Sequence, residues 1–460
     1  AKEKSRGRRD WARWLRGGIR PCGMLSFLYK TEYSNSTGKV LNIYCWDTSF
    51  RMLLENYYPA YDKEKQCIGD VQVHWVIVPN TDNIYQTTVD KALFESEDKA
   101  PDQRIDLFLA EADYVRKYAG NGEAALSLAE LGIEPEELTE QFPYTQALAR
   151  DEGGVQRGIT WQACPGVMIY RRDIAKKVLG TDDPAVVQQA VAGWPQFEQT
   201  AGRMQQQGFR TRVGYLDTDR CFCCRVSAPW VNEKQELVLY PAMQQWRDQT
   251  HSFSEKRENY SNNLWEKGWN EQVQGNVFCY FGPAWMIENA LRALSMAVSV
   301  SDGGREETGN GTFGQWAVCQ GPQPFFWGGT WLCAARGTDN AALIVDIMRT
   351  VCCEEAIAQQ MAQHSMEFVN NRRVMRELAA SSSMDMPLLG GQNAYAVMYN
   401  TAQHIEPQNI TAYDQGIHEA FQAACREYFD GKISKEAAWQ KFLATVWLKY
   451  PELQSASLVR

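Results

Sequence analysis

Several features that mark membrane proteins and common enzymes are missing from this 460-residue sequence. No run of apolar residues approaches the ~18–20 that a membrane-spanning helix needs. There is no Walker phosphate-binding loop, and no serine or cysteine stands in a recognisable nucleophile motif. The five histidines lie far apart, at positions 74, 251, 364, 404 and 418, so the sequence holds no metal-type pair. From these absences we expect no cofactor, no metal site and no enzymatic activity.

One glycine-rich motif matches a dinucleotide-binding fingerprint by its letters alone. Residues Gly309–Gly314 read Gly-Asn-Gly-Thr-Phe-Gly, the G-x-G-x-x-G spacing. The fingerprint binds phosphate only where it joins a strand to the N-terminus of a helix. Neither a strand pattern before it nor a helix pattern after it is found, so we reject nucleotide binding here.

The cysteine content does not indicate a protein built on disulfide bonds. Thirteen is an odd number, and in so long a chain it does not indicate a disulfide scaffold. The neighbours Cys223-Cys224 and Cys352-Cys353 could bridge each other only with strain. The run Cys221–Cys224 has no nearby histidine and the wrong spacing for zinc, so we reject a metal there. Most other cysteines are expected to be small buried hydrophobes, as at Cys45, Cys279, Cys319 and Cys333.

Positive charge is concentrated in the first 20 residues, although the net charge of the chain is −9. The basic positions of this arm are Lys2, Lys4, Arg6, Arg8, Arg9, Arg13, Arg16 and Arg20. The remainder is therefore acidic, which argues against nucleic acid as the main partner.

Residues 1–38 are expected to be a tail and tether. The basic arm is typical of the start of a signal sequence, but the apolar segment Gly23–Tyr29 is too short to complete one. Cys22 follows Ile19-Arg20-Pro21, a poor match to a lipoprotein cleavage site. Residues Ser34–Gly38 indicate a flexible connection to the first strand. We therefore expect an absent or degenerate signal sequence, and a lipid anchor stays open.

What the chain has in abundance is tryptophan, with 16 residues. Several stand where a chain turns: Trp285 follows Gly282-Pro283-Ala284, and Trp327 precedes Gly328-Gly329. An indole offers a flat apolar face with one N–H donor at its edge, which suits the C–H faces and hydroxyls of sugar rings. The pattern favours carbohydrate binding, and the alternative for each ring is ordinary core packing.

The first part of the chain alternates strands and helices. Apolar runs predict strands at Val40–Trp46, Val71–Val78 and Ile105–Leu109, with helices at Phe50–Tyr58 and Tyr85–Phe94 between them. This order predicts a parallel, doubly wound sheet with right-handed crossovers. Such sheets bind ligands beyond the carboxyl ends of their strands, which here carry Trp46-Asp47, Pro79–Asn83 and Glu111–Asp113.

Further elements follow along the chain. We expect a crossing strand over Ile159–Tyr170, helices over Asp173–Leu179 and Trp194–Gln207, a strand over Phe278–Phe281, a helix over Trp285–Leu294, strands over Trp316–Cys319 and Thr330–Ala335, a helix over Asn340–Ala362 and a mainly helical last hundred residues.

Four segments in this order resemble the extracellular solute-binding proteins of carbohydrate ABC transporters, family 1, the maltodextrin-binding type. They are Lys39–Trp46, Thr160–Ile174, Asn276–Trp285, and Gly321-Pro322 with Trp327–Leu332. The likeness covers roughly residues 39–450. One departure lies in the second segment, where Arg171-Arg172 replaces the asparagine and lysine usual in the family.

The resemblance implies two α/β lobes of the periplasmic-binding-protein-like type II fold, each with a doubly wound sheet, that close on a ligand about a hinge of chain crossings. Lobe 1 would comprise residues 39–160 with 316–378. Lobe 2 would comprise residues 161–315 with 379–460.

The cleft then implies a set of ligand-binding residues. One wall would carry Trp46, Asp47, Glu111, Asp113, Trp327 and Trp331. The crossing would carry Trp161, the opposite wall Trp285, and further candidates are Asp217, Trp230 and Tyr85. Each of these residues also has a purely structural alternative: core packing for the rings, an ordinary strand-end cap for Glu111 and Asp113, a plain turn for Asp217 and helix capping for Tyr85.

We therefore expect a bacterial, monomeric binding protein at the outer cell surface that passes a mono- or oligosaccharide to the permease subunits of an ABC importer. Two alternatives stay open. A glycoside hydrolase would need paired carboxylates, for which Glu111 with Asp217 is the only proposal. A binder of a cationic or other small solute would use an acidic cleft and cation–π contact.

Overall fold

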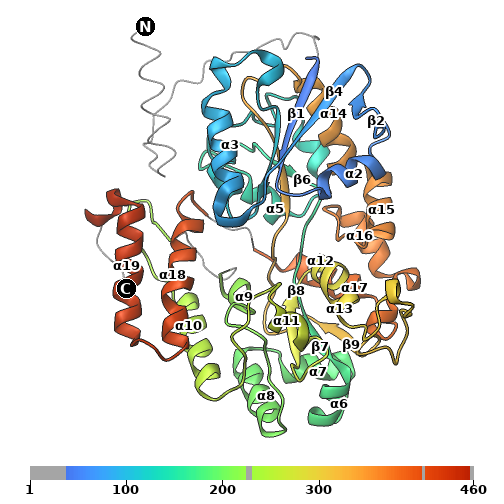
Figure 1. The fold of residues 1–460 in the computed structure, drawn as a ribbon, viewed down its shortest axis with the longest axis vertical. Helices are drawn as coiled ribbons and strands as arrows, with labels where there is room; N and C mark the ends of the chain where they lie inside the picture. Colours follow the sequence, from blue (N-terminus) through green and yellow to red (C-terminus); the bar gives the residue numbers. More distant parts are fainter. Residues whose placement is uncertain (1–37, 224–229, 407–409, 456–460) are drawn as a thin grey trace.

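The computed structural model describes residues 38–223, 230–406 and 410–455 (Figure 1). The basic arm, Cys22 and Cys224 lie outside the described residues, and with them the predictions made for the tail. The described chain contains two β-sheets with helices around them, which confirms the predicted α/β class. We call the part built on the seven-stranded sheet the first lobe and the part built on the three-stranded sheet the second lobe. They form the upper and lower halves of Figure 1.

The centre of the first lobe is the predicted parallel unit. β1 (Val40–Cys45) pairs in parallel with β4 (Val71–Ile77) on one side and with β5 (Leu107–Glu111) on the other. Helices α2 (Ser49–Tyr57) and α3 (Ile84–Phe94) make the crossovers. Leu41, Ile43 and Cys45 are fully buried in β1, as expected for a strand covered on its core side.

The rest of this sheet is antiparallel, which differs from the purely parallel sheet that the sequence predicted. β2 (Tyr61–Asp62) and β3 (Cys67–Ile68) extend one edge as a hairpin. β10 (Thr330–Ala334) runs against β5, and β6 (Ile159–Thr160) runs against β10. The reason is topological, because β10 brings the chain back from the second lobe and enters the sheet from the edge at which β5 ends.

The second lobe has a small sheet in the order β8-β7-β9. β7 (Val167–Arg171) pairs antiparallel with β8 (Cys279–Gly282) and with β9 (Trp316–Cys319). The single crossing strand predicted over Ile159–Tyr170 is therefore two strands, β6 and β7, one in each lobe. The predicted lobe boundary at residue 316 also moves, because β9 belongs to the second sheet and the chain crosses back after it.

Most helices lie where the sequence placed them, with two differences. The helix predicted over Asn340–Ala362 is broken at Cys353-Glu354, where Glu354 is extended and begins a new helix. The helix predicted over Trp285–Leu294 contains a π-helical turn at Ile287–Leu291. The remaining α-helices are α4 (Val115–Ala119), α5 (Pro143–Leu148), α6 (Arg172–Leu179), α7 (Pro184–Ala190), α8 (Trp194–Gln206), α9 (Asp219–Cys223), α10 (Pro241–Glu255), α11 (Lys267–Gln272), α12 (Ala284–Met286), α13 (Arg292–Leu294), α14 (Ala341–Cys352), α15 (Glu355–His364), α16 (Arg372–Ala379), α17 (Ala394–Gln403), α18 (Asp414–Phe429) and α19 (Lys435–Lys449).

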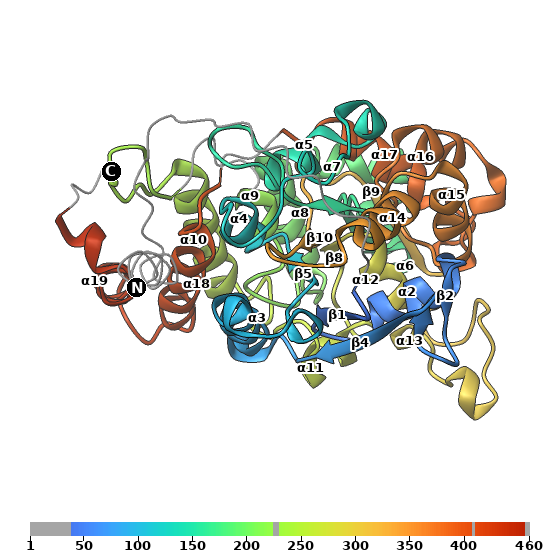
Figure 2. The same ribbon diagram turned by 90° about the horizontal axis from the view of Figure 1, so that it is seen from above.

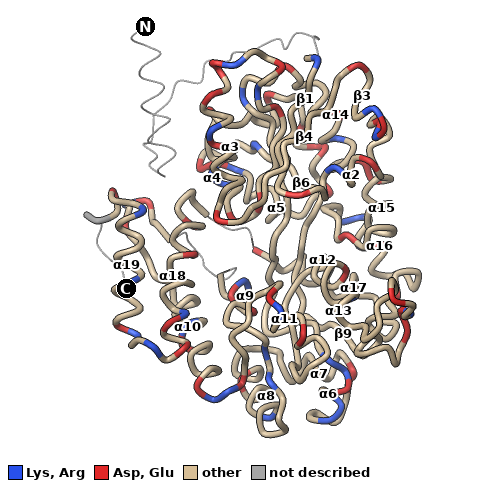
Figure 3. Tube along the Cα trace, viewed as in Figure 1, with Lys and Arg blue, Asp and Glu red and all other residues tan. Residues whose placement is uncertain are grey.

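The helices of the last hundred residues divide between two sides of the molecule. α18 and α19 pack side by side on one flank, and α15, α16 and α17 lie on the other (Figures 1 and 2). Acidic and basic positions are interspersed along both lobes (Figure 3). Among the residues that the structure describes, no helix combines the length and apolar character needed to cross a bilayer. Cys45, Cys279, Cys319 and Cys333 are buried thiols, as predicted.

Chain segments that pass between the lobes bond to one another; they include residues 161–166, between β6 and β7, and residues 320–329, between β9 and β10. In residues 161–166, Gly166 donates its amide to the carbonyl of Phe325 at 2.8 Å, and the carbonyl of Cys164 accepts the amide of Trp327 at 3.1 Å. The carbonyl of Trp161 accepts the amide of Asn370 at 2.7 Å. We call these bonded crossing segments the ribbon. It is not the whole connection between the lobes, because one hydrophobic cluster contains buried residues of both sheets.

Gly166 is the position in this ribbon where a side chain has no room. A Cβ atom built there would lie 2.1 Å from ring carbons of Phe325, itself 1% exposed. We expect Gly166→Ala to lower the free energy of unfolding by about 1–3 kcal/mol through overpacking. The measurement is urea unfolding followed by circular dichroism. Gly202→Ala is the control, because its Cβ would meet nothing closer than 3.9 Å within α8; equal losses in the two variants would contradict the steric argument.

Candidate functional site

Strand ends of the first lobe converge at one edge of its sheet. β1, β4 and β5 are parallel, so their carboxyl ends lie together, and the antiparallel β10 begins at the same edge. The amide of Ala112 donates to the carbonyl of Gly329 at 3.2 Å, which fixes the crossing segment beside the end of β5. Residues that follow these strands therefore share this edge with Trp327, two positions before Gly329.

An ion pair joins the two lobes at this edge. Asp113 follows β5 in the first lobe, and Arg220 belongs to α9 in the second. The guanidinium grips the carboxylate with two nitrogens, Nη2 donating to Oδ2 at 2.7 Å and Nη1 donating to Oδ1. Burial alone would raise the pKa of Asp113, but the charge and hydrogen bonds of Arg220 outweigh it and lower that pKa. Both side chains keep partial solvent contact, with 24% and 29% of their surfaces exposed.

A row of three indoles continues from this ion pair. The guanidinium of Arg220 lies 6.0 Å from the ring of Trp327. Trp285 meets Trp327 edge-on, with ring centroids 5.2 Å apart, and donates from Nε1 to the carbonyl of Trp327 at 3.2 Å. Trp265 lies 6.5 Å beyond Trp285. The row runs from the crossing segment along the second lobe, and Trp327 packs against both hydrophobic clusters of the described residues, one shared by the two lobes and one within the second lobe.

Gly328 and Gly329 make the turn that presents Trp327. Both have positive φ angles, +78° and +112°, which side-chain-bearing residues rarely adopt. A Cβ on Gly328 would also lie 3.3 Å from Nε1 of Trp285. The glycines that marked this segment in the sequence are therefore needed for the contact between the two rings.

Trp265 was missed by the sequence argument. Its side chain is 55% exposed, an unusual position for the largest apolar residue, and its φ of +72° puts a side-chain-bearing residue in the left-handed region. Strain of this kind persists where the surroundings enforce it, often at ligand sites. The only signal in the sequence was the turn-favouring Asn262-Asn263 before it.

Trp46 occupies the predicted position at the end of β1 and is partly exposed. Its ring meets Tyr85 edge-on with centroids 5.4 Å apart. Tyr85 itself is fully buried, and its hydroxyl donates to the carbonyl of Leu109 at 2.6 Å. In the structure Tyr85 supports Trp46 and ties α3 to β5, and a ligand contact of Tyr85 stays a prediction.

Three other predicted rings also belong to the interior. Trp161 stacks on Phe50 with centroids 5.6 Å apart and is 5% exposed. Trp331 is 1% exposed and donates from Nε1 to the carbonyl of Thr145 at 3.0 Å. Trp230 is 4% exposed among side chains of α18 and α19. Each of the three rings therefore has the core-packing position that was its alternative, and their ligand contacts stay predictions.

Of two further predicted carboxylates, Asp47 lies at the edge of the sheet and Asp217 lies in a turn of the second lobe. Asp47 is exposed beside Trp46 and accepts the amide of Ser49 at 2.8 Å at the start of α2. Asp217 accepts the amides of Val213 at 2.8 Å and Gly214 at 3.0 Å, so it closes a turn of the second lobe. The structure therefore brings Asp47 to the edge and gives Asp217 the turn role that was its alternative.

Glu111, the last residue of β5, is unusual among the acids at the edge. It is partly buried, and Asn80 donates to its Oε2 at 3.4 Å. Burial raises the pKa of Glu111 to about 8, helped by the nearby charges of Asp113 and Glu419 and opposed by Arg220. A neutral carboxyl group can both donate and accept a hydrogen bond, as a sugar hydroxyl can.

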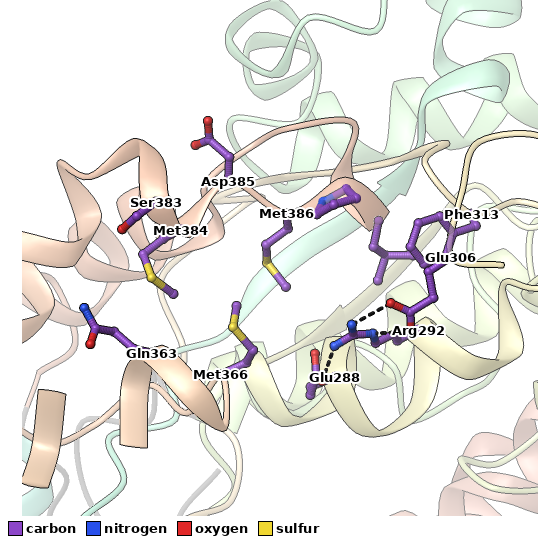
Figure 4. A pocket seen from close by; sticks show the side chains of 12 residues that line it. Glu288, Arg292, Glu306, Phe313, Gln363, Met366, Ser383, Met384, Asp385 and Met386 are labelled. Carbon is purple, nitrogen blue, oxygen red and sulfur yellow. Dashed lines mark hydrogen bonds and ion pairs between the residues drawn. The ribbon is translucent and has the colours of Figure 1, made fainter. Parts of the chain in front are cut away.

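A hollow away from this edge, with a cavity volume of about 160 Å³, has a different lining (Figure 4). Met366, Met384 and Met386 line it together with Arg292, which is held by Glu288 and Glu306. None of its twelve lining residues is a tryptophan or comes from the strand ends. The edge with the indole row is therefore the better candidate for a polar, ring-shaped ligand.

Comparisons with known proteins agree with this architecture. No sequence-family model and no curated protein matches the chain. The fold is that of two-lobed solute-binding proteins: one solved structure, an extracellular solute-binding protein family 1, has a TM-score of 0.72 at 14% identity, covering 90% of this chain and 100% of that one.

Two further solved structures are similar along most of the chain. An ABC-transporter-associated binding protein of B. animalis subsp. lactis, in complex with β-1,6-galactobiose, has a TM-score of 0.64 at 14% identity. The galacto-N-biose-/lacto-N-biose I-binding protein of Bifidobacterium longum, in complex with lacto-N-biose, has a TM-score of 0.63 at 14% identity. Each comparison covers 92% of this chain and 100% of the other. At these identities the likeness shows the fold.

The raised pKa of Glu111 predicts a pH dependence of stability. The folded state keeps this proton where the unfolded chain, with an ordinary pKa of 4.5, has released it. The free energy of unfolding should therefore fall as pH rises from about 4.5 to about 8. Glu111→Gln cannot ionise, so its stability should fall less over this window, measured by thermal unfolding at a series of pH values. Asp47→Asn controls for net charge and should keep the wild-type slope; an unchanged slope in Glu111→Gln would contradict the assignment.

Proposed function

We propose that this chain is a binding protein that captures a sugar or oligosaccharide between its two lobes and delivers it to a membrane permease. The observation that carries the proposal is the row of Trp265, Trp285 and Trp327 beside the ion pair of Asp113 and Arg220. Aromatic plates and charged hydrogen-bonding groups stand together at the edge where an open α/β sheet binds ligands. Solved structures of the same fold, bound to β-1,6-galactobiose and to lacto-N-biose, support the choice of ligand class.

The expected binding energy follows from these groups. Each aromatic ring removes about 150–250 Å² of apolar surface from water when it is fully covered. Charged groups such as Asp113 and Arg220 add hydrogen bonds of about 1.5–3 kcal/mol each. Trp46 and the neutral carboxyl of Glu111 would meet the same ligand from the first lobe. Together these contributions support micromolar affinity, about −8 kcal/mol.

Closure of the lobes would couple capture to delivery. Trp46, Asp47, Glu111 and Asp113 form the wall of the first lobe, and Arg220, Trp265 and Trp285 form that of the second, with Trp327 on the crossing. A ligand that contacts both walls favours the closed arrangement by the difference in its affinity for the two states. The ribbon of crossing segments would serve as the hinge. A permease can then distinguish loaded from empty protein by its shape.

The two alternatives receive less support. The glycosidase would need Asp217 as a partner for Glu111, but both amide bonds of Asp217 hold a turn of its own lobe. A cationic solute would need a strongly acidic cleft, whereas Arg220 neutralises Asp113 and burial favours the neutral form of Glu111. A neutral, hydroxyl-rich ligand fits these charges better, and binding without chemical conversion is the simpler function.

The cellular setting is part of this proposal. We propose a monomer that works at the outer surface of a bacterial cell, with lipid anchoring as an open feature of its tail. The setting rests on the shared fold and on the solved neighbours described as ABC-transporter proteins. Genes for two permease subunits beside the gene for this chain would support it.

Trp265 offers the cleanest test of ligand binding, because glycine should relax its strained backbone while removing its ring. We expect Trp265→Gly to keep or raise the free energy of unfolding and to weaken oligosaccharide binding about tenfold, a loss of about 1.4 kcal/mol. Isothermal titration calorimetry with mono- and oligosaccharides gives the affinity. Leu448→Ala, at an apolar side chain that is 84% exposed on α19, is the control and should leave affinity unchanged. An absence of heat from every sugar with the wild-type chain would overturn the proposed function.

The ion pair between the lobes should contribute to closure. We expect Arg220→Gln and Asp113→Asn each to weaken sugar binding and to increase the radius of gyration of the ligand-free protein in small-angle X-ray scattering. In a double-mutant cycle of binding energies the two losses should not add, with a coupling of about 0.5–3 kcal/mol. Arg157→Gln breaks a comparable pair with Asp151 inside the first lobe and serves as the control. Additive losses, or an equal expansion in the control, would contradict a closing role.

A further inference from the structure

The side chains of Asp219, Cys223 and His418, which all carry metal-binding atoms, meet beside α9, the helix that also carries Arg220. Asp219 and Cys223 stand one helical turn apart on α9, and His418 comes from α18, 199 residues beyond Asp219. One ligand atom from each residue, a carboxylate oxygen, the Cys223 sulfur and a ring nitrogen, lies within 4.8 Å of the other two. Oδ2 of Asp219 is 2.9 Å from Nε2 of His418. From the sequence we rejected a metal at Cys221–Cys224 because no histidine lay nearby and the spacing did not suit zinc; the fold brings His418 to Cys223.

The second carboxylate oxygen of Asp219 gives separate support for a bound cation. Asp219 is only 1% exposed, and its Oδ2 already has two hydrogen-bond partners, Nε2 of His418 and the side-chain amide of Gln422, the latter donating at 2.9 Å. Oδ1 is buried and has no hydrogen-bond partner among the described residues. A buried oxygen without a partner costs about 1–3 kcal/mol, more when it is charged. A cation between α9 and α18 would satisfy it.

The donor set and its spacing suit zinc. Zinc binds sulfur at about 2.3 Å and nitrogen or carboxylate oxygen at about 2.0–2.2 Å in tetrahedral geometry. Those bond lengths put ligand atoms about 3.3–3.8 Å from one another. The present separations span this range, from 2.9 Å to at most 4.8 Å, so shifts of about 1 Å would complete the geometry. Cys223 and His418 are partly exposed, which gives an ion access and leaves room for a water as the fourth ligand.

We propose that Asp219, Cys223 and His418 bind a divalent zinc ion that fastens α9 to α18. The ion stands apart from the sugar site and supplies no chemistry to it. Because Arg220 directly follows Asp219, the ion would also fix the helix whose arginine reaches the first lobe. This site goes beyond the proposed function, and its existence does not depend on sugar binding.

The rival explanation is a simple ion pair. Burial alone would lower the pKa of His418, but the charge and hydrogen bond of Asp219 raise it to about 9. A protonated His418 would then satisfy Oδ2 of Asp219 without any metal, although Oδ1 would stay without a partner. Zinc would have to displace this proton and that of the thiol, as metals commonly do.

Cobalt(II) distinguishes the two, because a thiolate bound to cobalt gives a charge-transfer band that an ion pair cannot give. The full chain would be stripped with a chelator, kept reduced and titrated with Co²⁺, followed by competition with Zn²⁺. We expect one equivalent of cobalt, displaced by zinc. Cys223→Ser should abolish the band, and His418→Gln and Asp219→Asn should weaken cobalt binding at least about tenfold.

The other thiols provide matched controls. Cys67→Ser and Cys353→Ser remove partly exposed cysteines elsewhere, and His404→Gln removes an exposed histidine at the end of α17. All three should keep the band, and circular dichroism would verify that every variant is folded. No band in the wild-type chain, or a band that survives Cys223→Ser, would overturn the zinc site in favour of the ion pair. Neither result would bear on sugar binding, which is measured without metal.

Discussion

Arg220 and Asp113 make a two-nitrogen, two-oxygen ion pair across the gap between the lobes, and the candidate site is organised around it. The pair sets how near α9 comes to the end of β5, and it keeps Asp113 charged where burial would favour a proton. It also holds a guanidinium beside Trp327, the first ring of the indole row. Because the pair is partly open to water, a ligand's hydroxyls can bond to it without having to break it.

In the proposed closure the chain crossings would keep one part of the site fixed while another part moves. Trp327 lies on a crossing segment, where its amide donates to the carbonyl of Cys164, and its ring packs against both hydrophobic clusters. In the proposed closure this ring would keep its place relative to the strand ends while the second lobe turns about the ribbon. Trp265 and Trp285 would move with that lobe. The sugar would thus be gripped between a fixed and a moving set of surfaces.

The proposed zinc ion and the strained Trp265 illustrate two ways of fixing a site on short elements. α9 has five residues, too few for a stable isolated helix, and needs tertiary contacts to hold Arg220 in place. An ion shared with the long α18 would provide one. Trp265 instead accepts an unfavourable backbone angle to present its ring to solvent. In both places the local backbone is less stable than it could be, and one side chain is held where the site needs it.

The sequence by itself determined the α/β class, the β1-β4-β5 unit and the strand ends that carry Trp46, Glu111 and Asp113, because apolar periodicity and parallel topology are local and repetitive signals. The Gly-Gly turn before β10 likewise marked Trp327. Burial was decided only by the tertiary structure: Trp161, Trp230 and Trp331 look like Trp285 in the sequence, but neighbours distant along the chain cover them. Tertiary structure alone also brought Arg220 to Asp113 and His418 to Asp219, since contacts across 107 and 199 residues leave no trace in spacing.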